Sequence, residues 1–235
     1  MNPSILSPEI AKVESAVIPR VSKARNEFIR RILLASGILS SLLYIAMCIF
    51  IPMQLEDYNS GSQTISELSA IGVSTRPIWV LFGILYTLLV AAFGLGVWQS
   101  ATSARSLHIA GALLIIYGLI GLGWPLAPMH QRETLAAGGG TISDTMHIVF
   151  SMASVLLMLL IIGFGAVAFG KRFRIYSIAT LVILLLFGAL TGMDGPNISE
   201  NLPTPWIGVL ERICIGVYML WVVVSAIVLL NRKET

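Results

Sequence analysis

The chain has 235 residues, of which 56% are hydrophobic and only 11% are charged, and its formal net charge at pH 7 is +3. Soluble domains carry roughly 25% charged residues, so this composition excludes an ordinary soluble globular protein. It also excludes an intrinsically disordered chain, because disordered chains are poor in apolar residues. The two cysteines are too few for a disulfide framework or a four-thiolate zinc site.

Long apolar stretches dominate the sequence. A helix needs roughly 20 apolar residues to cross the hydrocarbon of a bilayer, and its backbone hydrogen bonds are then satisfied internally. Six stretches meet this length without a charge in their central third: 32–53, 77–99, 109–128, 144–170, 176–193 and 206–230. We therefore predict an all-α membrane protein, a six-transmembrane-helix bundle over residues 32–231. A basic N-terminal segment (1–31) precedes it and a short tail (232–235) follows it.

The first apolar stretch is predicted to be a membrane helix rather than a cleaved signal peptide. Its apolar core is longer than the 7–15 residues typical of a signal peptide, and 31 residues precede it. Polar residues, not a small-residue cleavage site, follow it.

The basic residues predict how the chain is threaded. Twelve of the 15 Lys and Arg residues fall on one side of the predicted bundle, and the other three are Arg76, Arg132 and Arg212. By the positive-inside rule, both termini face the cytoplasm of a cell-membrane protein. The basic pI thus reflects membrane threading and gives no reason to expect a nucleic-acid partner. Membrane lipids are the expected partners, and segment 1–31 either lies along the anionic inner leaflet or remains a solvated tail.

A short pattern recurs in the three long outward connections: Thr or Asn is followed three residues later by an acid. It occurs at Thr64–Glu67, Thr141–Asp144 and Asn197–Glu200. The spacing is that of a capping box, so each pattern is predicted to begin a helix. On this interpretation Ile65–Ile71 forms a short interfacial helix that ends at Gly72.

Polar residues line one face of the fourth span. Asp144, His147, Ser151 and Ser154 follow 3-4-3 spacing, which places them on one side of a helix. The last span has a similar face with Glu211, Cys214, Tyr218 and Ser225, and the first has Ser40, Tyr44 and Cys48. Such faces avoid lipid, so a pocket that opens outward between these three spans is one hypothesis. The alternative is close helix packing, which small residues such as Gly94, Gly96 and Gly118 also favour.

The ionisable residues near the outer boundary need partners. Asp144 and His147 are three residues apart and can form a hydrogen bond. Glu211 and Arg212 are adjacent and cannot pair with each other along a helix, so we expect Arg212 to pair with Asp144 or Glu67.

The sequence gives little support for a metal site or for a catalytic nucleophile. No HExxH motif and no paired-cysteine spacing occur, so we predict no metal site and no cofactor, although scattered His, Asp and Ser ligands remain an alternative. Ser66 and Ser143 lack the glycine-flanked turn of a serine nucleophile. Cys48 and Cys214 are expected to be buried free thiols, and a disulfide between them in an oxidising compartment is the alternative.

Four elements of the sequence resemble the domain of unknown function 998 family. They are Tyr58–Gly72, Trp124–Pro128, Asp144–His147 and Gly208–Arg212, and they occur in the family's order across six spans. The family often has a second histidine where this chain has Ser143. The resemblance implies a multi-pass prokaryotic membrane protein without an assigned activity.

These observations lead to one main functional hypothesis. An outward polar site at interfacial depth would bind a lipid headgroup or a small polar ligand through Glu67, Asp144, His147, Ser151, Glu211 and Arg212. A lipid-directed hydrolase or transferase and a structural membrane subunit are the alternatives. Transport is disfavoured, because no ionisable residue lies near the predicted midplane.

Overall fold

The computed structural model describes residues 8–101 and 104–232, with side chains from Lys23 onward. Six long helices form the molecule: α1 (Pro8–Phe50), α2 (Arg76–Gln99), α3 (Arg105–Gly121), α5 (Ile142–Ala168), α6 (Lys171–Met193) and α8 (Ile207–Leu230). Short helical segments join them: η1 (Pro52–Gln54), η2 (Ile65–Ser69), η3 (Trp124–Leu126), α4 (Arg132–Ala136) and α7 (Gly195–Ser199). The described residues contain no strand, so the predicted all-α class is confirmed.

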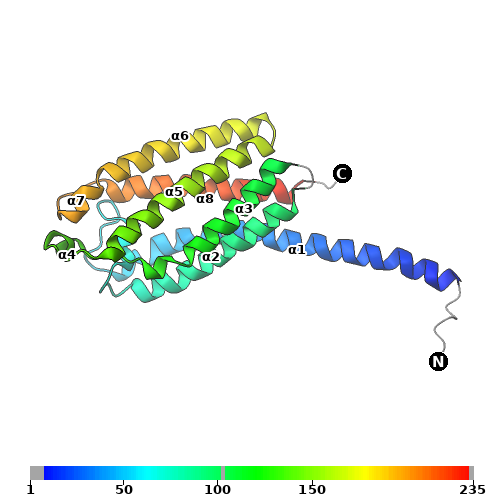
Figure 1. Ribbon diagram of the computed structural model, residues 1–235, viewed down its shortest axis with the longest axis horizontal. Coiled ribbons are helices and arrows are strands. Elements are labelled where there is room, and N and C mark those ends of the chain that lie inside the picture. Colours follow the sequence, from blue (N-terminus) through cyan, green and yellow to red (C-terminus); the bar gives the residue numbers. More distant parts are fainter. Residues whose placement is uncertain (1–7, 102–103, 233–235) are drawn as a thin grey trace, which may run out of the picture.

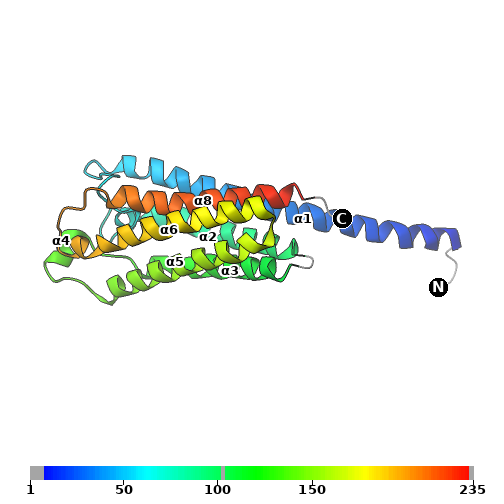
Figure 2. The same cartoon turned by 90° about the horizontal axis from the view of Figure 1, so that it is seen from above.

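The long helices run side by side and form a ring (Figures 1 and 2). Around the ring each helix packs chiefly on its two neighbours, in the order α1, α2, α3, α5, α6, α8, and α8 packs again on α1. The N-terminal end of α1 and the C-terminal end of α8 lie at one end of the bundle, which we call the terminal end. The opposite end, which we call the capped end, carries the short helical segments.

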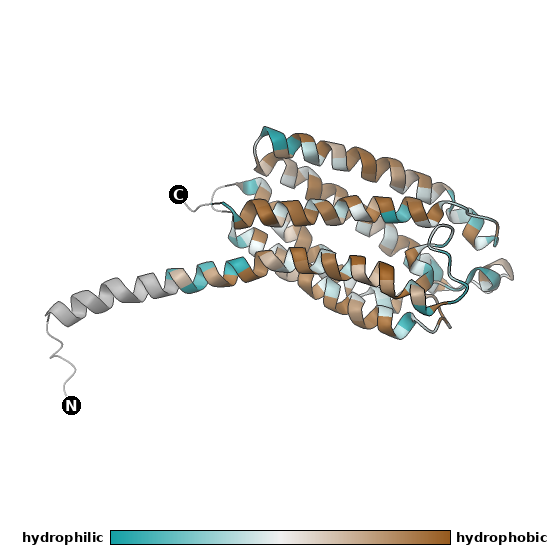
Figure 3. Ribbon diagram, turned by 180° about the vertical axis from the view of Figure 1, so that it is seen from behind, coloured by the Kyte–Doolittle hydropathy of each residue, from teal (hydrophilic) through white to brown (hydrophobic). Residues whose placement is uncertain are grey.

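Six helices are long and apolar enough to cross a membrane, as predicted: Lys23–Gln54, Arg76–Gln99, Arg105–Leu126, Ile142–Ala168, Lys171–Ser199 and Ile207–Leu230. Apolar residues cover the outside of the bundle, while polar residues gather at its two ends (Figure 3). This chain is therefore a multi-pass membrane protein, because an apolar exterior of this extent is stable only in lipid.

Several helices begin earlier than the apolar stretches do. The third begins at Arg105 rather than residue 109, and the fifth at Lys171 rather than residue 176. Long basic side chains at a span end can reach the interface, so helical hydrogen bonding continues beyond the apolar core. The helix α1 runs from Pro8 into the first span without a break, and its first part projects beyond the bundle (Figure 1).

Glycines allow close contact between neighbouring helices, as the sequence predicted. A Cβ added at Gly94 would lie 2.7 Å from the backbone nitrogen of Ile115, and one added at Gly118 would lie 2.7 Å from the carbonyl oxygen of Thr87. Both positions join α2 to α3. Larger residues there would force the two backbones apart.

Two hydrogen bonds join neighbouring helices near the terminal end. The Arg30 guanidinium is buried and donates to the Ser100 hydroxyl (3.1 Å), which links α1 to the end of α2. The Trp221 indole N–H donates to the Ser177 hydroxyl (2.9 Å), which links α8 to α6. The second bond explains why this tryptophan lies inside a span rather than at an interface.

Gly118→Ala is expected to destabilise the protein by about 1–3 kcal/mol, because the new methyl group would overlap backbone atoms of α2. Gly83→Ala is the matched control, because a Cβ at Gly83 meets no atom within 4 Å. Thermal unfolding of the purified protein in detergent measures both. An unchanged melting temperature for Gly118→Ala would contradict the close α2–α3 contact.

Candidate functional site at the capped end

The loop before η2 lies on the first turn of α8. The backbone N–H groups of Gly208 and Val209 both donate to the Gly61 carbonyl, at 3.0 and 3.3 Å. A Cβ added at Gly208 would overlap the carbonyl oxygens of Ser60 and Gln63. Glycine therefore fits at position 208 because the loop backbone approaches α8 so closely.

Arg212 holds the same loop from the side. Its Nη1 donates to the carbonyls of Ser60 (2.9 Å) and Gln63 (3.1 Å), and its Nη2 donates to the Tyr58 hydroxyl (2.8 Å). The guanidinium carbon also lies 5.8 Å from the centre of the Tyr58 ring. The expectation that Arg212 pairs with Asp144 or Glu67 is therefore wrong. The guanidinium instead donates to loop carbonyls, which have no hydrogen-bond partner within a helix.

Tyr58 completes this contact from the loop side. Its hydroxyl donates to the Thr64 carbonyl (2.7 Å) while it accepts from Arg212. Burial raises the pKa of Tyr58 to about 12, so the phenol keeps its proton at neutral pH and remains a donor.

Glu211 lies one residue before Arg212 and contacts η2. Its Oε2 accepts the backbone N–H of Ile65 at 2.5 Å. This N–H is one of the unpaired donors at the start of a helical segment. The side chain is partly exposed, and Oε1 has no hydrogen-bond partner among the described residues.

Glu67 caps η2 and forms an ion pair. It accepts the backbone N–H of Thr64 (2.6 Å), which confirms the capping box predicted for residues 64–67. The helical segment ends at Ser69, two residues earlier than predicted, and Gly72 adopts the positive φ of +86° beyond it. Both oxygens of Glu67 also pair with Arg132, at 2.6 and 2.9 Å, and the carboxylate is only 7% exposed.

Arg132 connects three loops at once. Besides Glu67, it donates to the Thr204 hydroxyl (2.7 Å) and to the Ser62 carbonyl (3.1 Å). The bonds to Glu67 raise the pKa of the Arg132 guanidinium above its ordinary value. A bidentate pair supported by further hydrogen bonds fixes the loops with defined geometry.

Asp144 caps α5 and pairs with a residue other than the predicted one. It accepts the backbone N–H of Thr141 (2.8 Å), which confirms the second capping box. It also accepts the backbone N–H of His130 (2.7 Å), and its other oxygen lies 2.8 Å from the ring Nδ1 of His130. The expected bond to His147 does not form, because His147 Nδ1 lies 2.9 Å from the Ala127 carbonyl.

The remaining predicted residues also have partners within the protein. The His147 ring packs edge-on against Trp124, with centroids 5.0 Å apart. The Ser151 hydroxyl donates to the His147 carbonyl one turn earlier (2.9 Å), a local bond that is common for serine in helices. Cys48 and Cys214 are free thiols, as predicted; Cys214 is buried, whereas Cys48 is only partly buried.

The third recurring pattern was interpreted wrongly. Asn197 lies inside α7 and Glu200 follows its last residue, so the pattern ends a helix instead of beginning one. Pro196, at the start of α7, explains the difference, because proline favours the first turn of a helix and moves its beginning upstream.

The predicted site residues therefore form two groups. Glu67, Glu211 and Arg212 surround the loop of residues 58–67, whereas Asp144, His147 and Ser151 lie along the start of α5. Among the residues that the structure describes, no group of three or more His, Cys, Asp or Glu side chains is placed to hold a metal ion.

Sequence reasoning missed Arg132 and the pairing role of His130. One signal was available for Arg132, which is one of three basic residues on the side of the bundle predicted to face away from the cytoplasm. Arg76 behaves in the same way, because it donates to the carbonyls of Ser69 (2.7 Å) and Pro125 (3.0 Å). All three of these arginines join loops at the capped end.

The amino-acid sequence matches the model of a known protein family. The model of the family described as "Protein of unknown function (DUF998)" matches residues 38–228. The chain belongs to this family. No curated protein and no solved structure matches it. Three of the elements that carried the resemblance, 58–72, 124–128 and 208–212, contribute contacts that hold the capped end together.

Arg132→Ala is expected to destabilise the protein by about 3–5 kcal/mol, because it leaves the buried Glu67 carboxylate without a counter-charge. Chemical unfolding in detergent measures the change. Glu133→Ala is the control, because Glu133 is the exposed neighbour on α4. A loss below 1 kcal/mol for Arg132→Ala would show that the ion pair does not hold the capped end.

Proposed function

We propose that this membrane protein of the DUF998 family binds a lipid headgroup or a small polar ligand at the capped end. In this proposal the capped end faces away from the cytoplasm, and the ligand lies at interfacial depth beside Glu211 and Arg212. The surrounding loops are held in place by the other predicted residues, Glu67, Asp144 and His147.

The observation that carries the proposal is the unused oxygen of Glu211. One carboxylate oxygen accepts the Ile65 N–H, and the other has no partner among the described residues although the side chain is partly exposed. A carboxylate near the membrane interface is a costly group, and it favours a partner that donates hydrogen bonds.

Arg212 supplies the complementary charge. Its Nη1 and Nη2 groups hold the loop, while its Nε makes no hydrogen bond to the described residues. A ligand that carries both an ammonium and a phosphate can thus pair with Glu211 and Arg212 together. Phosphoethanolamine has this chemistry, either as a lipid headgroup or as a free molecule.

Glu211→Gln is expected to weaken binding of phosphatidylethanolamine about tenfold, because the amide keeps the bond from Ile65 but loses the charge that attracts the ammonium. Native mass spectrometry of the protein with phosphatidylethanolamine or phosphatidylcholine measures the preference. The choline headgroup has no N–H donor, so the wild type should favour ethanolamine. Competition by free phosphoethanolamine distinguishes a soluble ligand from the lipid.

Glu133→Gln removes an exposed carboxylate of the same end and should leave the preference unchanged. Equal binding of both lipids by the wild type, or an unchanged preference in Glu211→Gln, would contradict the proposed site.

The proposed orientation has its own test. A cysteine introduced at exposed Gly140, between α4 and α5, should react with a membrane-impermeant maleimide in intact cells, because twelve of the 15 basic residues are predicted to lie on the opposite side. A cysteine at Arg172 should react only after permeabilisation. Both are made in a background without Cys48 and Cys214, and the reverse pattern would overturn the orientation.

A further inference from the structure

Three basic residues lie where α5 ends and α6 begins, at the terminal end of the bundle (Figure 3). Lys171, Arg172 and Arg174 occupy the first turn of α6, and all three side chains are exposed. We call this group the basic corner. No carboxylate among the described residues forms an ion pair with it. The arginines of the capped end, by contrast, donate to loop carbonyls of the protein itself. The positive charges of the basic corner can therefore pair with an anion from outside the chain.

The beginning of α6 adds to the positive potential of the basic corner. The first N–H groups of a helix have no partner within the helix, and they carry a partial positive charge. Gly170, the N-cap of α6, has no side chain that could accept from them, and the first turn contains no acidic residue. Basic side chains are unfavourable beside this partial charge, so a bound anion would stabilise both the side chains and the helix end.

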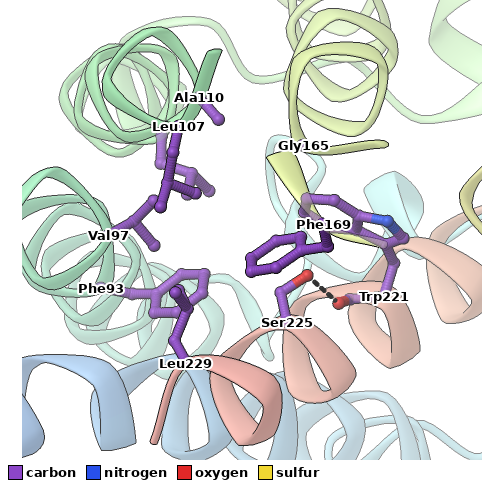
Figure 4. Close-up of a pocket in the computed structure, with 10 residues that line it drawn as sticks. Phe93, Val97, Leu107, Ala110, Gly165, Phe169, Trp221, Ser225 and Leu229 are labelled. Atoms are coloured by element: carbon purple, nitrogen blue, oxygen red, sulfur yellow. Dashed lines mark hydrogen bonds between the residues drawn. The ribbon is translucent and has the colours of Figure 1, made fainter. Parts of the chain in front are cut away.

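The packing of two phenylalanines fixes the direction in which the basic corner faces. Phe169 follows the last residue of α5 and lines a small interior cleft together with Phe93 and Trp221 (Figure 4). Phe173 is only 9% exposed, and its ring centroid lies 4.5 Å from that of Phe169 and 5.8 Å from that of Trp221. Because Phe173 packs inward, residues on the opposite side of this turn face outward.

An apolar stripe continues from Lys171 along the outward face of α6. Ile175, Ile178 and Val182 follow Lys171 at spacings of four, three and four residues, which places all four on one side of the helix. The three apolar side chains are between 51% and 59% exposed, so they face lipid in a membrane. A positive charge thus stands at the end of a lipid-facing stripe, with Arg174 beside it at i+3.

We propose that the basic corner binds the headgroup of an anionic phospholipid such as phosphatidylglycerol. The phosphate lies against Lys171, Arg174 and the first N–H groups of α6, and an acyl chain lies along the stripe that begins at Ile175. Clusters of basic residues at the membrane surface attract anionic lipids. The stripe favours a lipid over a soluble anion, because only the lipid has an acyl chain to contact it. This site is separate from the capped end and does not depend on the ligand proposed there.

Native mass spectrometry of the purified protein with dioleoyl phosphatidylglycerol or dioleoyl phosphatidylcholine tests this inference. The two lipids have the same acyl chains, but only phosphatidylglycerol carries a net negative charge. The wild type should bind phosphatidylglycerol about tenfold more tightly, because several basic side chains attract the anion. Equal binding of the two lipids would overturn the proposal.

Two double variants locate the site. Lys171→Gln with Arg174→Gln should remove most of the preference for phosphatidylglycerol. Lys23→Gln with Arg25→Gln is the matched control, because it removes the same charge from exposed residues of α1, which packs chiefly on α2 and α8 rather than on α5 or α6. The control should keep the preference. If the two double variants lose it equally, or if the first variant keeps it, the basic corner is not the binding site.

Glycerophosphoglycerol, which is the same headgroup without acyl chains, distinguishes a lipid site from a site for a soluble anion. An excess of this compound should leave phosphatidylglycerol bound, because it makes no contact with the apolar stripe. Displacement of the lipid would show that the charges alone determine binding, and it would overturn the proposed lipid site.

Discussion

The structure depends on the contact between the first turn of α8 and the loop of residues 58–67. Loops at the end of a membrane bundle expose carbonyl and N–H groups close to lipid, where unpaired groups are costly. Gly208 lets the loop approach, Glu211 accepts the N–H of Ile65, and Arg212 donates to two loop carbonyls. The last span thereby fixes η2, and η2 in turn presents Glu67 to Arg132.

This arrangement gives most of the conspicuous polar residues a structural role. In the sequence, Glu67, Asp144 and His147 are candidate ligand-binding residues, yet each has a partner within the protein. Among the described residues, unused bonding capacity lies elsewhere: in one oxygen of Glu211 at the capped end, and in the buried hydroxyls of Tyr176 and Tyr218. The proposal for the capped end follows from Glu211, because a bound molecule would satisfy its unused oxygen.

Features set by local sequence could be predicted, and those set by distant contacts could not. Six spans follow from the length of the apolar stretches, and two capping boxes follow from residues three apart. The partner of Glu67 lies 65 residues away and that of Asp144 lies 14 residues away, in segments without periodicity. The interior face of Tyr218 was visible in the helical spacing, but its unpaired hydroxyl depends on the packing of four helices.

Hydrogen–deuterium exchange of Arg212→Lys tests the central claim most directly. Lysine keeps the positive charge but cannot donate to two carbonyls and the Tyr58 hydroxyl in one plane. We predict faster exchange of the amides in residues 58–69, because Arg212 donates hydrogen bonds to this segment. Exchange in α3 should not change, because the bonds of Arg212 go to the loop and not to α3. Unchanged exchange in residues 58–69 would contradict the claim that the first turn of α8 holds the capped end in place.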